Sequence, residues 1–445
     1  MNLKSVSAVF FITFLAISPA FSQVKKLTLE AVIQLAVENQ PELNQSQILR
    51  EITDARVKSD LSGWWPQAGV SGEYFRYFEQ PVAIFPNFNN PGSGEFQEVR
   101  TGVPFNAALN FYVEQQLINN QLLLAKDQAE MRRREADQLL MTAYMAMKTE
   151  VSKAFYEVLL SQESIRITAE DIQRQERQLA DARALYQAGI NDNIDYKRAT
   201  ITLQNTRAEL FRAKEDIQVR MAELKALAGI SPENEVELLY DLDALLEDSK
   251  ADTLSPVVYT KRPEFNLVES RQALQDAEVR FFRRAYIPEV SGFFNYNLLY
   301  QTLEGGMLFN RSYPNSLAGL RLSFPIFQGG RRAHNIRAAR LERSQLDFVQ
   351  DSVQLMINRE FQTALSDYKS NLYQLGILKD NLDLADEIYK TVSLQYEEGI
   401  KNFLEVIQAE TDLRTTRLNY YNALFRLMSS KMDLQRARGD IELIL

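Results

Sequence analysis

The side chains that could carry out chemistry are unevenly represented in this sequence. The chain has one histidine, His334, and no cysteine, against 59 aspartates and glutamates. Cysteine is therefore excluded as a nucleophile, a disulfide partner or a thiolate metal ligand. No HExxH motif, phosphate-binding glycine loop or nucleophile elbow occurs. His334 lies beside Arg331 and Arg332, and we interpret it as a solvated helix residue rather than a catalytic one. The residue types predict no enzyme, no metal site and no cofactor.

The carboxylates are spread along the chain rather than gathered in motifs. Acidic pairs three or four residues apart arise on any charged helix without a function, so we interpret most of them as solvated faces. They give the chain a formal net charge of -9. A negative surface disfavours nucleic acid as a partner and otherwise serves solubility.

Many of these charges lie on a segment that is too long for a helix of a compact domain. Residues 117–188 contain neither glycine nor proline. About 70 residues at about 1.5 Å each reach about 100 Å, more than three times the thickness of a bilayer. A stripe with a seven-residue period faces neighbouring helices only if the helices supercoil, so we predict a coiled-coil rod. The apolar stripe consists of Tyr144, Val151, Val158, Ile165, Ile172, Leu179 and Tyr186. A companion register is smaller and more mixed, and it consists of Met147, Ala154, Ser161, Thr168 and Ala182, interrupted by Gln175.

The rod occurs twice, because the sequence contains an internal repeat. Positions 40–44 superpose on 262–266, and farther on, at a slightly smaller offset, 186–190 superpose on 396–400. Each rod turns at an x-Gly-Ile and returns as a shorter helix, which predicts two helical hairpins with tip turns near 188–192 and 398–402. Glycine suits such a turn, since it adopts a left-handed conformation without strain. The second stripe consists of Phe361, Tyr368, Leu375, Leu382, Tyr389 and Tyr396.

Four segments between the helices alternate apolar and polar residues, as strands do. They lie near 66–78, 104–117, 288–301 and 316–327. About ten alternating residues followed by a turn are typical of a membrane β-strand, although a small soluble sheet has the same period.

Aromatic residues favour the membrane interpretation. Trp64 and Trp65 precede the first strand, and Tyr74 and Phe75 lie at its far end, as at two membrane interfaces. Packing of Trp64 beneath the sheet is the alternative. The segment 81–104, rich in glycine and proline, is expected to be an exposed connection.

The N-terminal segment 1–22 has the pattern of a secretory signal. Lys4 supplies the positive charge, 6–17 the apolar run and Ala20-Phe21-Ser22 the cleavage site. Beyond them there is no run of about 18 apolar residues, so a mature chain that enters a membrane must do so as a closed β-barrel. Membrane barrels need at least about eight strands, and a chain with four must therefore share one barrel with other copies.

Three motifs add to this duplicated plan: Phe324-Pro325-Ile326-Phe327-Gln328-Gly329-Gly330-Arg331, Asn193-Ile194-Asp195 and Phe403-Leu404-Glu405. With them, the chain resembles the TolC-like outer-membrane efflux proteins. The resemblance covers nearly the whole mature chain and implies an α+β membrane protein. In that family a homotrimer forms a twelve-stranded outer-membrane β-barrel, four strands per chain, continued by a long periplasmic α-helical coiled-coil barrel. It implies two structural repeats, 23–230 and 262–445, joined by an equatorial linker, 231–261.

The resemblance also implies a function. The chain would form the exit duct, in the outer membrane with a large periplasmic portion, of a tripartite efflux or type I secretion system. It would contact outer-membrane lipid, a periplasmic adaptor and an inner-membrane transporter of the RND, ABC or MFS type. The alternative is a periplasmic coiled-coil adaptor or structural protein without a pore, which would need one hairpin and a soluble β domain.

At the hairpin tips the resemblance assigns residue roles. Asp195 and Tyr396 match residues that tie neighbouring hairpins shut, and Glu405 matches the outer member of an acidic pair that constricts the tip. The second acid of that pair corresponds to Gln408 and a tip arginine to Lys401, so we expect weaker or differently ion-dependent closure. The exposed tip residues, expected to contact an adaptor, are Gly189, Ile190, Gly399 and Ile400.

Overall fold

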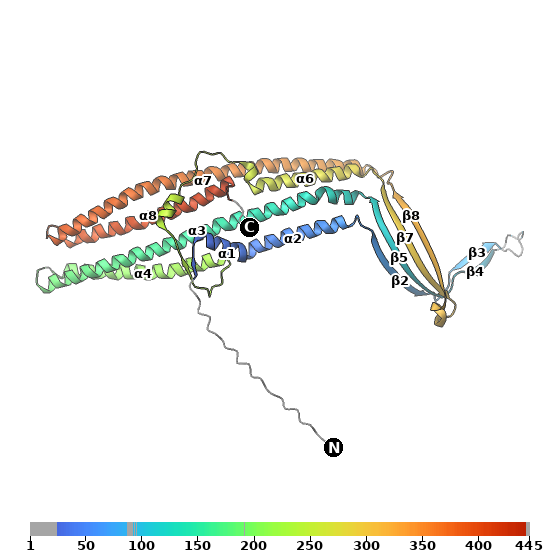
Figure 1. The fold of residues 1–445 in the computed structure, drawn as a ribbon, viewed down its shortest axis with the longest axis horizontal. Helices are drawn as coiled ribbons and strands as arrows, with labels where there is room; N and C mark the ends of the chain where they lie inside the picture. Colours follow the sequence, from blue (N-terminus) through green and yellow to red (C-terminus); the bar gives the residue numbers. More distant parts are fainter. Residues whose placement is uncertain (1–24, 87–91, 93, 95, 191, 442–445) are drawn as a thin grey trace, which may run out of the picture.

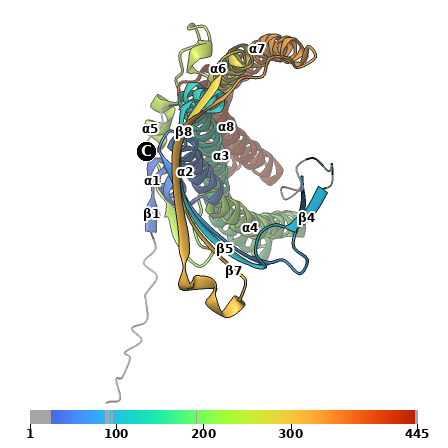
Figure 2. The ribbon, with the colours of Figure 1, turned by 90° about the vertical axis from the view of Figure 1, so that its right-hand side faces the viewer.

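The computed structural model describes residues 25–86, 92, 94, 96–190 and 192–441. The predicted signal, 1–22, lies outside the described residues. The described chain is elongated, with long helices side by side and a sheet at one end (Figure 1). Seen from the sheet end, helices and strands lie along a curve rather than around a filled centre (Figure 2). Among the described residues, no helix is both long enough and apolar enough to cross a membrane.

Two helices have the length of the predicted rods. They are α3 (Asn120–Gln187) and α7 (Arg331–Glu397), with 68 and 67 residues. The Asn119 side chain begins α3 by accepting hydrogen bonds from the N–H groups of Gln121 and Leu122, which would otherwise be unsatisfied. Each rod returns through a shorter helix, α4 (Asn193–Leu227) after α3 and α8 (Phe403–Arg438) after α7.

The helices form a single layer whose members change along its length. Toward the tips the neighbours are α4, α3, α8 and α7 in that order. Toward the sheet, α2 (Pro41–Ser62) packs on α3, and α6 (Pro263–Arg284) packs between α3 and α7. A proline begins both α2 and α6, where its missing N–H leaves no hydrogen bond unmade.

The predicted stripe of α3 is buried over only part of its length. Tyr144, Val151 and Val158 are buried, but Ile172 is half-buried and Tyr186 is exposed. The companion register three residues on is buried throughout. Because α3 packs against helices on both sides, the positions between them are the most enclosed and carry small or polar side chains. This register consists of Met147, Ala154, Ser161, Thr168, Gln175 and Ala182.

Small elements surround the middle of the helical layer. The described residues begin with β1 (Lys25–Leu27) and α1 (Leu29–Asn39), and β1 pairs in parallel with β6 (Val236–Leu238). The segment between α4 and α6 continues through α5 (Leu242–Asp248) and the short η1 (Tyr259–Lys261), crossing the helices at mid-length (Figure 1). The larger buried apolar cluster lies here and includes Val32, Tyr144 and Phe425.

The main sheet has four antiparallel strands in the order β2-β5-β7-β8. These are β2 (Gln67–Arg76), β5 (Phe105–Ile118), β7 (Glu289–Thr302) and β8 (Ser312–Ser323), with the short η2 (Gly305–Asn310) between the last two. Both ends of β8 lie four residues earlier in the sequence than the ends of the predicted range, 316–327. Pro325 has no N–H to donate to a sheet, which fits an end before it.

The connection between β2 and β5 contains more strand structure than predicted. Within the expected connection 81–104, β3 (Val82–Pro86) and β4 (Phe96–Arg100) form a second antiparallel pair. This pair projects beyond the main sheet (Figure 1). Residues 82–86 and 96–100 of the connection therefore form strands. Its exposed apolar residues, Ile84 and Phe96 among them, are of types common in strands. The glycines and prolines around them had favoured an irregular connection instead.

Candidate functional site

The two hairpin tips have the backbone geometry that was predicted. Gly189 and Gly399 have φ values of +71° and +74°, a conformation that glycine adopts without strain. Apart from their chain neighbours, no described atom lies within 4 Å of the position that a Cβ would take, so backbone conformation rather than space favours glycine. Ile190 and Ile400 follow them with 69% and 72% of their surface exposed.

A cleft of about 1030 Å³ lies between the two tips and is lined by both hairpins. Asp195 and Arg198 reach it from α4, and Tyr396 and Lys401 from the second hairpin. The structure thus brings together three of the five predicted gate residues. Glu405 and Gln408 are not among the residues that line the cleft.

Tyr396 makes an aromatic contact at the cleft. Its ring packs on Phe403, with 5.8 Å between centroids. Its hydroxyl oxygen is buried and has no hydrogen-bond partner among the described residues. Burial, together with the nearby carboxylates of Asp195 and Asp181, raises the pKa of Tyr396, so the phenol keeps its proton at neutral pH. The predicted tie between Asp195 and Tyr396 stays a prediction.

Glu405 does not stand as an isolated charge. Its carboxylate lies 2.5 Å from the Nζ atom of Lys401, one turn earlier. Farther along α8, the Gln408 side-chain amide donates a hydrogen bond of 2.9 Å to Asp412. Asp412 is seven residues beyond Glu405 and therefore lies near the same helix face. The sequence analysis did not include Asp412 among the tip residues, although its spacing of seven residues from Glu405 is visible in the sequence.

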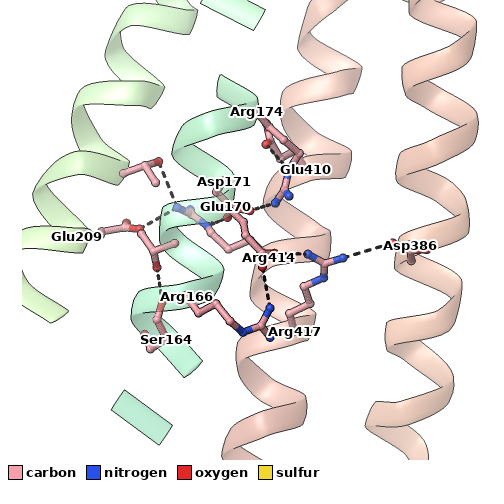
Figure 3. A network of polar contacts seen from close by, with 12 residues as sticks. Ser164, Arg166, Glu170, Asp171, Arg174, Glu209, Asp386, Glu410, Arg414 and Arg417 are labelled. Atoms are coloured by element: carbon pink, nitrogen blue, oxygen red, sulfur yellow. Dashed lines mark hydrogen bonds and ion pairs between the residues drawn. The ribbon is translucent and has the colours of Figure 1, made fainter. Parts of the chain in front are cut away.

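A network of buried charges joins the hairpins in the part of the rods nearer the tips (Figure 3). Asp171 on α3 and Glu410 on α8 are 0% and 3% exposed. Arg174 contacts both carboxylates, at 3.2 Å in the case of Glu410. Arg414 lies 3.7 Å from Asp171 and donates a hydrogen bond of 2.8 Å to Glu209 on α4. Burial raises the pKa of Glu410, and Arg174 opposes the shift.

A third arginine extends this network to α7. Arg417 lies 3.6 Å from Glu170 on α3 and 3.5 Å from Asp386 on α7 (Figure 3). Four helices are thereby linked through ionic contacts. The expectation that acids on the rods are solvated was wrong for Asp171 and Glu410, because α3 and α8 pack together at these positions. The arginines three and four residues away were the signal that could have shown it.

The sheet has chemically different faces. Residues paired directly across strands share a face, and one such row crosses all four strands as Ser71, Asn110, Asn297 and Asn315. The next row, on the opposite face, is Gly72, Leu109, Leu298 and Pro314. A cleft of about 470 Å³ lies against the polar row. One face can therefore contact water and the other an apolar surface.

The two tryptophans lie where the helices meet the sheet. Both follow α2, and the Trp65 N–H donates to the carbonyl of Ser62 at 3.0 Å. Trp65 is exposed and Trp64 is half-buried. Their predicted place at a membrane interface stays a prediction.

Comparisons with known proteins give one consistent result. The profile of the family described as "Outer membrane efflux protein" matches residues 32–230 and 258–440. The cobalt-zinc-cadmium resistance protein CzcC of Cupriavidus metallidurans is 24% identical over 306 residues, which cover 66% of this chain and 68% of CzcC. Outer membrane protein OprJ of Pseudomonas aeruginosa is 22% identical over 299 residues. That match covers 67% of this chain but only 62% of OprJ.

Solved structures share the fold at low sequence identity. The CmeC outer membrane channel of Campylobacter jejuni superposes with a TM-score of 0.67 at 16% identity, covering 99% of this chain and 94% of CmeC. The open state of the MtrE outer membrane channel of Neisseria gonorrhoeae gives a TM-score of 0.68 at 15% identity. It covers 92% of this chain and 88% of MtrE.

Proposed function

The chain belongs to the outer membrane efflux protein family, and we propose that it forms the outer-membrane exit duct of a tripartite efflux or type I secretion system. One observation carries this proposal: a sheet with a polar and an apolar face continues directly into a curved layer of helices. A wall of that kind separates lipid from water at the sheet and encloses a passage along the helices.

The duct requires several copies of the chain. β2 and β8 are the two edges of the sheet, and each leaves one row of backbone groups without a strand partner among the described residues. In lipid those groups must be paired, which a closed barrel achieves. We propose three copies and twelve strands, with the Asn110 face toward the lumen, the Leu109 face toward lipid, and Trp64 and Trp65 at an interface.

The remaining parts of the chain have places in the same assembly. We take 23–230 and 262–445 as two structural repeats and 231–261 as an equatorial linker around the helical barrel. The tips face the periplasm, where Ile190 and Ile400 contact an adaptor that connects the duct to an inner-membrane transporter. Asp195, Tyr396, Lys401, Glu405 and Gln408 form the periplasmic gate.

The ion pair of Lys401 with Glu405 supports a gate of reduced charge. Each Glu405 carries a lysine within 2.5 Å, so a ring of three would attract cations less than bare carboxylates would.

Cell fractionation tests the proposal. The chain should appear in outer-membrane fractions as a trimer that dissociates to monomer on heating in detergent. Leu109→Arg should reduce that trimer, because it places a charge on the lipid face, and Asn110→Arg is its matched control. Recovery of the parent chain as a soluble periplasmic protein would contradict the proposal and favour the adaptor alternative.

A further inference from the structure

A band of neutral polar side chains crosses the face of the main sheet that we assign to the lumen. Strands of a sheet are about 4.8 Å apart, so a row with one side chain from each of four strands is about 14 Å long. The cleft of about 470 Å³ lies along this row. The band consists of Ser71, Asn110, Asn297 and Asn315, with Asn295 in the next row.

The band offers many hydrogen bonds and little charge. An asparagine amide presents two N–H donors and an acceptor oxygen, and a serine hydroxyl both donates and accepts. Among the described residues that line the cleft, Glu73 is the one charged side chain, and its carboxylate accepts hydrogen bonds from hydroxyl groups. An ion bound here would lose hydration with few charged groups to replace it. The chemistry of the band therefore suits a neutral solute that donates and accepts hydrogen bonds.

A flat apolar surface lies beside the band. Gly69 and Tyr112 pair directly across β2 and β5, and a Cβ at Gly69 would overlap the Tyr112 ring. The ring therefore lies against the backbone of β2, as aromatic residues do opposite glycines in sheets. Tyr112 shares a face with Asn110, two residues before it, and is 40% exposed. Among the described residues, no other ring and no cation stacks on it.

The other aromatic ring that lies over a glycine of this face is already covered. Phe293 and Gly319 pair directly across β7 and β8, and the Phe293 Cζ lies 2.9 Å from where a Gly319 Cβ would be. The Arg321 guanidinium lies 5.1 Å from the Phe293 ring centroid. Tyr112 thus differs from Phe293 in having a ring that a solute can reach.

We propose that this band is a binding site in the wall of the duct for a neutral carbohydrate. A sugar ring carries hydroxyl groups at its edge, which suit the amides of Asn110 and Asn297, and faces of C–H groups, which suit the Tyr112 ring. A hydrocarbon has no hydroxyl groups and a metal ion has no apolar face, so neither uses both features. This inference rests on the proposed function, which turns this face toward the lumen, and adds a class of solute.

The site recurs in the proposed assembly. Three copies related by a threefold axis place three such bands at one level of the barrel. A solute that passes through a duct must leave each site as readily as it enters, so binding is weak and reversible. The expected signature is a brief interruption of ion current rather than a stable complex.

Planar bilayers with purified trimers test the site. Maltohexaose, a neutral glucose oligomer, is added on the side opposite the helices and should reduce the ion current up to a saturating level. Polyethylene glycol of similar hydrodynamic size is the matched solute. It enters the lumen but has ether oxygens in place of most hydroxyl groups, so its effect should rise with concentration without saturating.

Substitutions at the two parts of the site give separate readings. Asn110→Leu/Asn297→Leu removes two amides and should raise the concentration of maltohexaose for half-maximal block about tenfold. Gln116→Leu is its matched control, because it lies on the same face of β5 outside the cleft, and it should leave the block unchanged. Tyr112→Leu should weaken the block, whereas Tyr112→Phe keeps the ring and should retain it. The Tyr112 pair decides the matter if the double leucine variant does not assemble.

The outcomes separate this inference from the proposed function. A purified chain that forms no channel contradicts the duct. Channels whose current maltohexaose and polyethylene glycol reduce alike, without saturation, overturn the carbohydrate site and leave the duct intact. A saturating block by maltohexaose that Asn110→Leu/Asn297→Leu and Tyr112→Leu both retain would also overturn it, since the sugar would then bind elsewhere.

Discussion

Replacing Arg174 tests whether the buried charges hold the hairpins together. The side chain of Arg174 is 18% exposed and contacts Asp171 and Glu410, which are almost fully enclosed. Arg174→Met keeps much of the side-chain volume but leaves Glu410 without its closest cation, and Asp171 with Arg414 at 3.7 Å. Removing one partner of a buried ion pair typically costs about 3–5 kcal/mol, and we expect a loss of that size in the free energy of unfolding.

Glu410→Gln is the matched control, with the opposite electrostatic effect. Burial raises the pKa of Glu410 above its ordinary value of 4.5 despite the contact with Arg174. A raised carboxyl pKa means that the folded state binds the proton more tightly than the unfolded state. The stability contributed by this group is then complete below the ordinary pKa and is lost as pH rises through the folded pKa. Glu410→Gln should remove this part of the pH dependence and cost much less than Arg174→Met at neutral pH.

Urea unfolding of the detergent-solubilised protein, followed by helical circular dichroism from about pH 4 to 8, measures both effects. The reasoning fails if Arg174→Met costs less than about 1 kcal/mol, as an exposed pair would. It also fails if Glu410→Gln is the more damaging change at neutral pH.

Three further predictions concern the sheet and the tips. Leu109→Arg should cost about 2–4 kcal/mol near the bilayer midplane and Asn110→Arg much less, so equal assembly yields would reject the assigned faces. Gly399→Val should reduce copurification with the adaptor more than trimer assembly, because φ at Gly399 is +74°, where a β-branched residue is strained; intact copurification would place the adaptor contact elsewhere. Lys401→Met should leave the charge of Glu405 unpaired and increase the block of channel conductance by divalent cations in planar bilayers. Glu405→Ala should remove most of this block. Unchanged block in both variants would move the constriction away from Glu405.

The long helices, the glycine turns and the alternating strands could be predicted because each depends on local patterns. Helix length follows from the absence of glycine and proline in 117–188, and the turns follow from the conformational freedom of Gly189 and Gly399. The alternation of Leu109 and Asn110 assigns them to opposite faces whatever the neighbouring strands are. These predictions require no knowledge of what packs against the element.

The features that were missed depend on contacts between distant segments. Asp171 and Glu410 look like solvated acids until α8 is placed against α3, although the two residues lie in different halves of the sequence. Gln175, which interrupts the companion register in the sequence, is buried with that register for the same reason. The Lys401 ion pair with Glu405 is different, because its spacing of four residues was visible in the sequence.

Thiol labelling along β5 tests the central claim most directly, because a duct wall must face water on one side and lipid on the other. Asn110→Cys and Leu109→Cys are adjacent on one strand, in a chain that has no other cysteine. In intact outer membranes, a water-soluble, membrane-impermeant maleimide should label Asn110→Cys and leave Leu109→Cys unmodified, because a thiol that faces lipid stays protonated. After denaturation in detergent the same reagent should label both variants, which shows that each thiol is present and reactive. Equal labelling of both positions by the water-soluble reagent in intact membranes would contradict the account, since the sheet would then be surrounded by water.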